Sequence, residues 1–143
     1  MFLKSLNQQD KSLFLELAMH IACVDNEFHD AEEFLINEYR KEMGLIDYTL
    51  MNIDIEKIID YFKNSTSNVK KIVYFESILL INADKKTATE EVEFVKRLKM
   101  EFEISDQLEK CINNWVNNSL SEMIEICIEL SNKEIEIIDM LSL

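Results

Sequence analysis

Five carboxylate side chains lie within nine consecutive residues of this chain, with no lysine or arginine among them. They are Asp25, Glu27, Asp30, Glu32 and Glu33. Oxygen ligands at this density suit a hard divalent cation such as Ca²⁺ or Mg²⁺. The segment is not an EF-hand loop, because Asp30 stands where such a loop needs glycine. We treat Asp25, Glu27, Asp30 and Glu32 as candidate metal ligands.

The same carboxylates also have a structural interpretation, which we favour. Asp25 follows an apolar helical stretch, and the C-terminal end of a helix disfavours an anion by about 0.3 to 1 kcal/mol. Backbone N–H groups at the start of the next helix can compensate Asp25 as well as a cation can. Glu32 and Glu33 then complement the positive end of that helix. Both interpretations stay open at this point.

A second, weaker acidic turn runs from Asp84 to Glu91. Lys85 and Lys86 follow the aspartate directly and neutralise much of its charge. Asp84 and Glu91 are therefore the less favoured metal candidates, and a structural role is the more natural one for both.

Histidine and cysteine offer one further site. His20 and Cys23 are one helical turn apart and His29 follows, so a zinc site can be drawn from the three. We prefer packed side chains at these positions. Cys23, Cys111 and Cys127 form an odd, widely spaced set, which predicts reduced and buried thiols.

The elements that must position these residues are helices. The chain has one glycine and no proline, so it lacks the turn residues that sheets need. We predict a single all-α domain over residues 1–143 with six or seven helices. Apolar spacing places them at 8–23, 30–43, 54–64, 68–81, from 87 or 89 to 102, from 106, and from 119 onwards with a break at 131–132. Asp47 is expected to cap a short helical turn, and Asp106 with Glu109 to form a capping box.

An internal repeat organises this pattern. Shifting the chain by 59 residues lays 11–47 onto 70–106. The apolar positions Leu35, Ile36, Tyr39 and Met43 fall on Phe94, Val95, Leu98 and Phe102, which predicts the same buried face in both units. We expect two helix, acidic turn, helix units related by a local twofold, with the C-terminal helices packed across them.

The two turns resemble the motif of the TerB-like (tellurite-resistance) family, in which an aspartate precedes a glutamate by seven residues. The copies are Ala22-Cys23-Val24-Asp25-Asn26 through Glu32, and Ile81-Asn82-Ala83-Asp84-Lys85 through Glu91. The family's glycine is replaced by Asn26 and Lys85, which weakens a ligand site most in the second copy. The resemblance implies an all-helical domain of a bacterial or phage stress or defence system. It also implies protein partners or a place at the membrane face, with metal bound by the acidic clusters.

Composition excludes several classes of function. A net charge of -13 repels phosphate backbones, so nucleic acid is a poor partner. No apolar run is long enough to span a bilayer and no signal peptide is evident, which favours a cytoplasmic protein. Nucleophile, phosphate-loop and HExxH motifs do not occur, so we do not expect an enzyme. The sequence favours a non-catalytic protein-interaction domain, with a Ca²⁺ or Mg²⁺ sensor or store as the alternative. It leaves homo-oligomers open.

Overall fold

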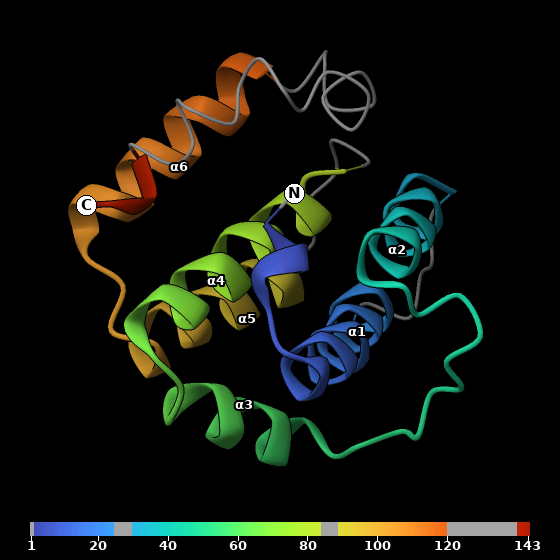
Figure 1. Ribbon diagram of the computed structural model, residues 1–143. Coiled ribbons are helices and arrows are strands. Elements are labelled where there is room, and N and C mark those ends of the chain that lie inside the picture. The colour runs from blue at the N-terminus through green and yellow to red at the C-terminus, as the bar shows by residue number, and fades with distance from the viewer. Residues whose placement is uncertain (1, 25–29, 84–88, 120–139) are drawn as a thin grey trace.

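The computed structural model describes residues 2–24, 30–83, 89–119 and 140–143. Over these residues the chain forms six α-helices, one short 3-10 helix and no strand, so the predicted all-α class is confirmed. The elements, shown in Figure 1, are η1 (Leu3–Ser5), α1 (Gln8–Cys23), α2 (Asp30–Met43), α3 (Ile55–Lys63), α4 (Ser67–Ile81), α5 (Thr89–Glu101) and α6 (Asp106–Ser119). None of the helices in these ranges is both long and apolar enough to cross a bilayer.

Helix α4 is the centre of the core. Every residue from Ile72 to Ile81 is buried, including Glu76 and Ser77. It packs against α1, α2, α3 and α5, and in Figure 1 it lies between the α1–α2 pair and α6. A helix that is apolar on all sides is stable only where other elements cover it completely. The remaining helices therefore arrange themselves around α4.

The predicted core residues of the first repeat unit are all buried, whereas those of the second unit are buried only in part. Tyr39, Leu98 and Phe102 are 3%, 0% and 2% exposed, which confirms them as core residues. Phe94 and Val95, by contrast, are only half-buried. Their repeat counterparts on α2 are buried, so the prediction of equal faces is wrong at these two positions. Phe94 is less buried than its counterpart because it lines a pocket on the surface of the bundle.

The starts of α1 and α4 repeat the same hydrogen bonds at the 59-residue offset. The Asn7 side chain accepts from the Asp10 N–H at 2.8 Å, and the Thr66 side chain accepts from the Val69 N–H at 3.3 Å. Both residues are N-caps with extended backbone, and each satisfies one N–H that the first helical turn leaves unpaired. The repeat therefore extends to the caps, although the two capping residues differ.

The ends of α2 and α5 repeat in the same way. Gly44 and Glu103 occupy equivalent positions and both have left-handed backbone, with φ of 70° and 55°. The next N–H then donates back to the carbonyl five residues earlier, at 2.7 Å for Leu45 and 3.0 Å for Ile104. This is the Schellman arrangement, which normally uses glycine. Glu103 holds it without glycine, so α5 ends with a strained residue where α2 does not.

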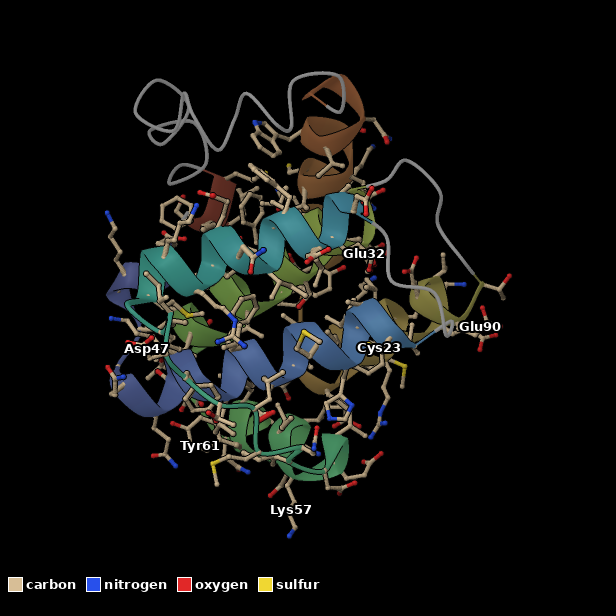
Figure 2. The ribbon with its side chains drawn as sticks, turned by 90° about the vertical axis from the view of Figure 1, so that its right-hand side faces the viewer. Cys23, Glu32, Asp47, Lys57, Tyr61 and Glu90 are labelled. Carbon is tan, nitrogen blue, oxygen red and sulfur yellow. The ribbon has the colours of Figure 1, made fainter. Side chains whose placement is uncertain are left out.

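The predicted helical turn after Asp47 is wrong. Residues 44–54 contain turns but no helix, so Asp47 caps nothing. Arg40 explains this: its guanidinium donates to the carbonyls of Leu45 and Tyr48, at 3.1 and 2.7 Å, and holds them in an open loop. Figure 2 shows Asp47 in that loop.

The cap of α6 is also shifted by one residue from the prediction. Ser105, not Asp106, is the capping residue, because its hydroxyl accepts from the Leu108 N–H at 3.1 Å. Asp106 instead pairs with Lys99 of the preceding helix. The predicted segment after 119, with its break at 131–132, lies outside the described residues.

Candidate functional site

Only part of the acidic turn can be placed. Asp25, Glu27 and Asp84 lie outside the described residues, as does His29. Asp30 is exposed at the first position of α2, whereas Glu32 is 1% exposed. Residues two apart on a helix do not face each other, so α2 alone does not direct both carboxylates to one ion.

The repeat pairs Glu32 with Glu91, and the two share their environment. Each is the third residue of its helix, and Glu91 is 2% exposed. In the described ranges no group of three or more His, Cys, Asp or Glu side chains is placed to hold a metal ion. What the two units have in common is thus a buried glutamate in the first turn of the second helix. Figure 2 shows Glu32 at that position, where α2 begins.

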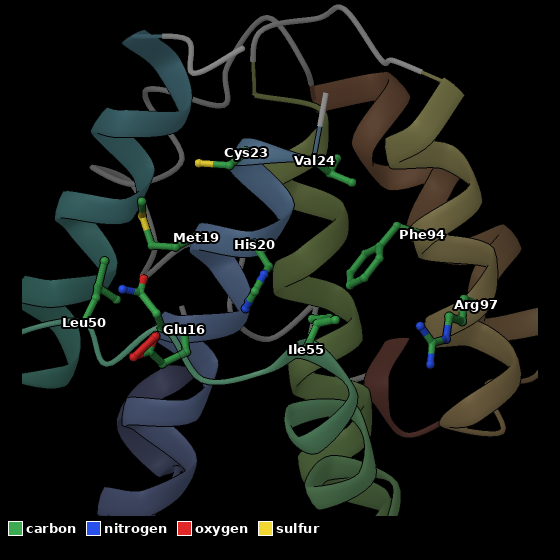
Figure 3. A pocket seen from close by; sticks show the side chains of 10 residues that line it. Glu16, Met19, His20, Cys23, Val24, Leu50, Ile55, Phe94 and Arg97 are labelled. Carbon is green, nitrogen blue, oxygen red and sulfur yellow. The ribbon is translucent and has the colours of Figure 1, made fainter. Parts of the chain in front are cut away.

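A hollow in the described surface lies elsewhere, along the outward side of α1 (Figure 3). We call it the α1 pocket. Its volume is about 440 Å³, within the usual range of about 300 to 1,000 Å³ for ligand pockets. One side is formed by the loop before α3 and the other by α5. It is lined by Glu16, Met19, His20, Cys23, Val24, Leu50, Asn52, Ile55, Phe94 and Arg97.

The spacing of the α1 residues explains why they share one face. Glu16, Met19, His20, Cys23 and Val24 follow the i, i+3, i+4, i+7, i+8 pattern of a single helical stripe. At 1.5 Å per residue this stripe is about 12 Å long. The predicted apolar stripe of α1, with Phe14, Leu17 and Ile21, faces the core instead. Helix α1 therefore packs into the core with one face and lines the α1 pocket with the other.

Glu16 is a buried carboxylate in the pocket wall, only 2% exposed. Its Oε1 accepts a short hydrogen bond from the Met51 N–H and a longer one, 3.4 Å, from the Tyr48 hydroxyl. Burial, followed by the charge of Glu16, raises the pKa of Tyr48 above its usual value. Glu16 thus fixes the loop before α3 against α1.

His20 holds the same loop one helical turn further on. Its Nε2 lies 2.8 Å from the Ile53 carbonyl oxygen. A carbonyl only accepts, so Nε2 carries the proton in this contact. Between these two anchors Asn52 has left-handed backbone, with φ of 53°, a conformation that asparagine adopts at low cost.

Arg97 is the cation of the pocket lining, and it is neutralised. Its guanidinium forms a two-pronged ion pair with Glu56 of α3, with nitrogen to oxygen distances of 2.8 and 2.5 Å. Hydrogen bonding from Arg97 lowers the pKa of Glu56. The pair ties α3 to α5 at one edge of the pocket.

The thiols are less buried than predicted. Cys23 is exposed at the end of α1 and Cys111 is half-buried, while Cys127 lies outside the described residues. Cys23 is exposed because it belongs to the outward stripe of α1. His20 and Cys23 do line one pocket (Figure 3), but with His29 outside the described residues the structure does not bring a zinc triad together.

Sequence reasoning missed the α1 pocket, although one signal was present. Glu16 and His20 are polar residues four apart within a helix whose neighbouring positions are apolar.

Comparison of the chain with known protein families, with characterised proteins and with solved structures gives no match.

Proposed function

We propose that this chain is a non-catalytic protein-interaction domain of TerB-like type, working in a bacterial or phage stress or defence system. The α1 pocket is the observation that carries the proposal. Its walls are apolar, from Met19, Leu50 and Phe94, and it opens to the surface beside Met51, whose side chain is 70% exposed. Methionine is well suited to such surfaces because its flexible thioether adapts to different partners.

The polar groups of the pocket support binding more than catalysis. Glu16 and His20 are both engaged in holding the loop before α3, and Arg97 is paired with Glu56. A nucleophile would need a base within hydrogen-bond reach and a third group to orient that base. The Nε2 of His20 is directed to the Ile53 carbonyl, which favours a supporting role for the ring.

Photo-crosslinking in the cells that express the chain tests the proposal. A photoreactive phenylalanine analogue is placed at Met51, beside the pocket, or at Lys110, which is exposed on α6. We expect a defined protein adduct from the first variant and not from the second. The captured protein, produced separately, should then form a complex with the purified chain. Equal adducts at both positions, or no complex between the purified proteins, would contradict the proposal.

A further inference from the structure

The unused hydrogen-bonding capacity of the α1 pocket identifies the chemistry of its occupant. Both hydrogen bonds to Glu16 use Oε1, so within the described part of the chain Oε2 has no donor. The Nε2 of His20 donates to the Ile53 carbonyl. Glu16 is a carboxylate on a buried residue, for which a charge-assisted donor from an occupant of the pocket is the strongest partner.

Apart from Asn52 and Arg97, the remaining lining is apolar, and it carries no uncompensated positive charge. Arg97 would repel a cation, but Glu56 neutralises it through two hydrogen bonds. Phe94 is half-buried, so part of its ring is accessible in the pocket. An aromatic face attracts a cation held within about 6 Å of its centre.

We infer that the α1 pocket binds a basic amphipathic segment of a partner protein, with an apolar side chain seated between Leu50 and Phe94. A neighbouring lysine or arginine donates to Glu16. The inference rests on the proposed function and adds the chemistry of the partner. The net charge of -13 favours the approach of a basic segment. A helix offers the required spacing, because its apolar side chains recur at i, i+3, i+4 and i+7.

Three synthetic peptides test this chemistry. Each has about 15 residues, since shorter helices are marginal in water, and a leucine stripe at helical spacing. They differ only in the residues that flank the stripe, which are lysine, glutamine or glutamate. Binding is followed at physiological ionic strength through the backbone amide resonances of the full chain. We expect the lysine peptide to shift the amides of Met51, Ile53 and Phe94, and the glutamine peptide to bind at least about tenfold more weakly.

Matched variants separate the pocket from general attraction to an acidic protein. Glu16→Gln keeps the carbonyl oxygen that accepts from Met51 and Tyr48, so the loop should stay in place, and an unchanged melting curve checks this. It should weaken the lysine peptide about tenfold. Glu103→Gln removes the same charge from an exposed site at the end of α5 and should change binding less than about twofold. Phe94→Ala should weaken binding, whereas Phe34→Ala, on α2, should not.

Several outcomes overturn the inference. Equal affinity of the lysine and glutamine peptides would show that no cation is recognised. Equal losses in Glu16→Gln and Glu103→Gln would show that only the net charge matters. Amide shifts away from the pocket would place the peptide elsewhere. A partner crosslinked at Met51 whose binding is insensitive to Glu16→Gln would leave the proposed function standing and remove this inference. Binding of the lysine peptide without any crosslinked partner would leave the chemistry of the pocket standing and remove the proposed function.

Discussion

The Tyr61 hydroxyl of α3 donates a 2.6 Å hydrogen bond to Oδ1 of Asp10 in the first turn of α1. Asp10 is only 4% exposed, so this contact supplies a buried carboxylate with a hydroxyl donor. The backbone N–H of Asp10 donates to the side chain of Asn7, which caps the same helix. The two residues join the first helix to the third, and Figure 2 shows Tyr61 in this position.

Removing that hydroxyl should destabilise the fold. In Tyr61→Phe the Asp10 carboxylate loses a donor while it stays buried, and we expect a loss of about 1 to 3 kcal/mol in the free energy of unfolding. Urea denaturation with an unchanged slope measures it. Tyr48→Phe is the control, because its 3.4 Å contact with Glu16 is longer and weaker. Equal losses in the two variants would contradict the importance of the Asp10 contact.

Tyr61 should also shape the stability of the protein in alkaline solution. Burial, with help from the Asp10 hydrogen bond, raises the pKa of Tyr61 from 10.0 to about 12. The unfolded chain therefore loses this phenolic proton first. The contribution of Tyr61 is complete below about pH 10 and is lost as the pH rises towards about 12. Stability against urea measured across this window should fall less steeply in Tyr61→Phe than in the parent chain; an identical slope would show that the pKa of Tyr61 is not raised.

The two left-handed helix ends should respond oppositely to glycine and alanine. No atom lies within 4 Å of a Cβ built on Gly44, so Gly44→Ala should cost only backbone strain, about 1 kcal/mol. Glu103→Gly relieves the same strain at the equivalent position, and we expect it to be neutral or stabilising by up to about 1 kcal/mol. Thermal denaturation of both variants checks this. A large loss in Glu103→Gly would show that the Glu103 side chain stabilises the end of α5.

Phe102 should be among the most costly side chains to truncate. It is 2% exposed and its ring contacts Phe62 edge to face, with centroids 6.4 Å apart. Phe102→Ala should lower the free energy of unfolding by about 3 to 5 kcal/mol through lost burial and the cavity that remains. Met100→Ala, on the 77% exposed side chain two residues earlier, should change it by less than about 0.5 kcal/mol. A loss below about 1 kcal/mol in Phe102→Ala would mean that the site collapses around the deletion.

Asp30 and Glu32 separate the metal and structural interpretations of the acidic turn. If the turn holds Ca²⁺ or Mg²⁺, Asp30→Asn and Glu32→Gln should both abolish a saturable stabilisation that grows with metal concentration. We expect the other result. Glu32→Gln should cost about 1 to 3 kcal/mol because it alters a buried carboxylate, and Asp30→Asn should cost less than about 1 kcal/mol. Melting curves with and without millimolar metal distinguish the two, and a calorimetric isotherm lost in Asp30→Asn would establish the metal site.

Apolar spacing was sufficient to predict the helices. The helix starts at Gln8, Asp30 and Asp106 agree with the predicted bounds. Helices α1 and α6 each begin directly after a capping side chain. The choice between Ser105 and Asp106 as the cap was not predictable from spacing, since either residue can cap. In the structure Ser105 is the cap, because its hydroxyl accepts from the Leu108 N–H while Asp106 pairs with Lys99.

The α1 pocket could not be predicted in the same way. It depends on how the loop before α3 lies along α1, and Glu16 and His20 fix that path through contacts more than 30 residues apart in sequence. Local periodicity carries no information on such contacts. Cys23 illustrates the same limit, because its residue type favours burial while its place on the outward stripe of α1 exposes it.

The burial of α4 from Ile72 to Ile81 has a consequence for how the chain reaches its native state. While the protein is being synthesised, α1, α2 and α3 leave the ribosome before α4, which is the helix that covers their apolar faces. Each of these three helices packs against α4, so without α4 part of their apolar surface is uncovered. Until α4 has emerged, the apolar faces of these helices stay uncovered, which favours aggregation. Folding should therefore be all-or-none, and a chain truncated after α3 should aggregate rather than form half a bundle.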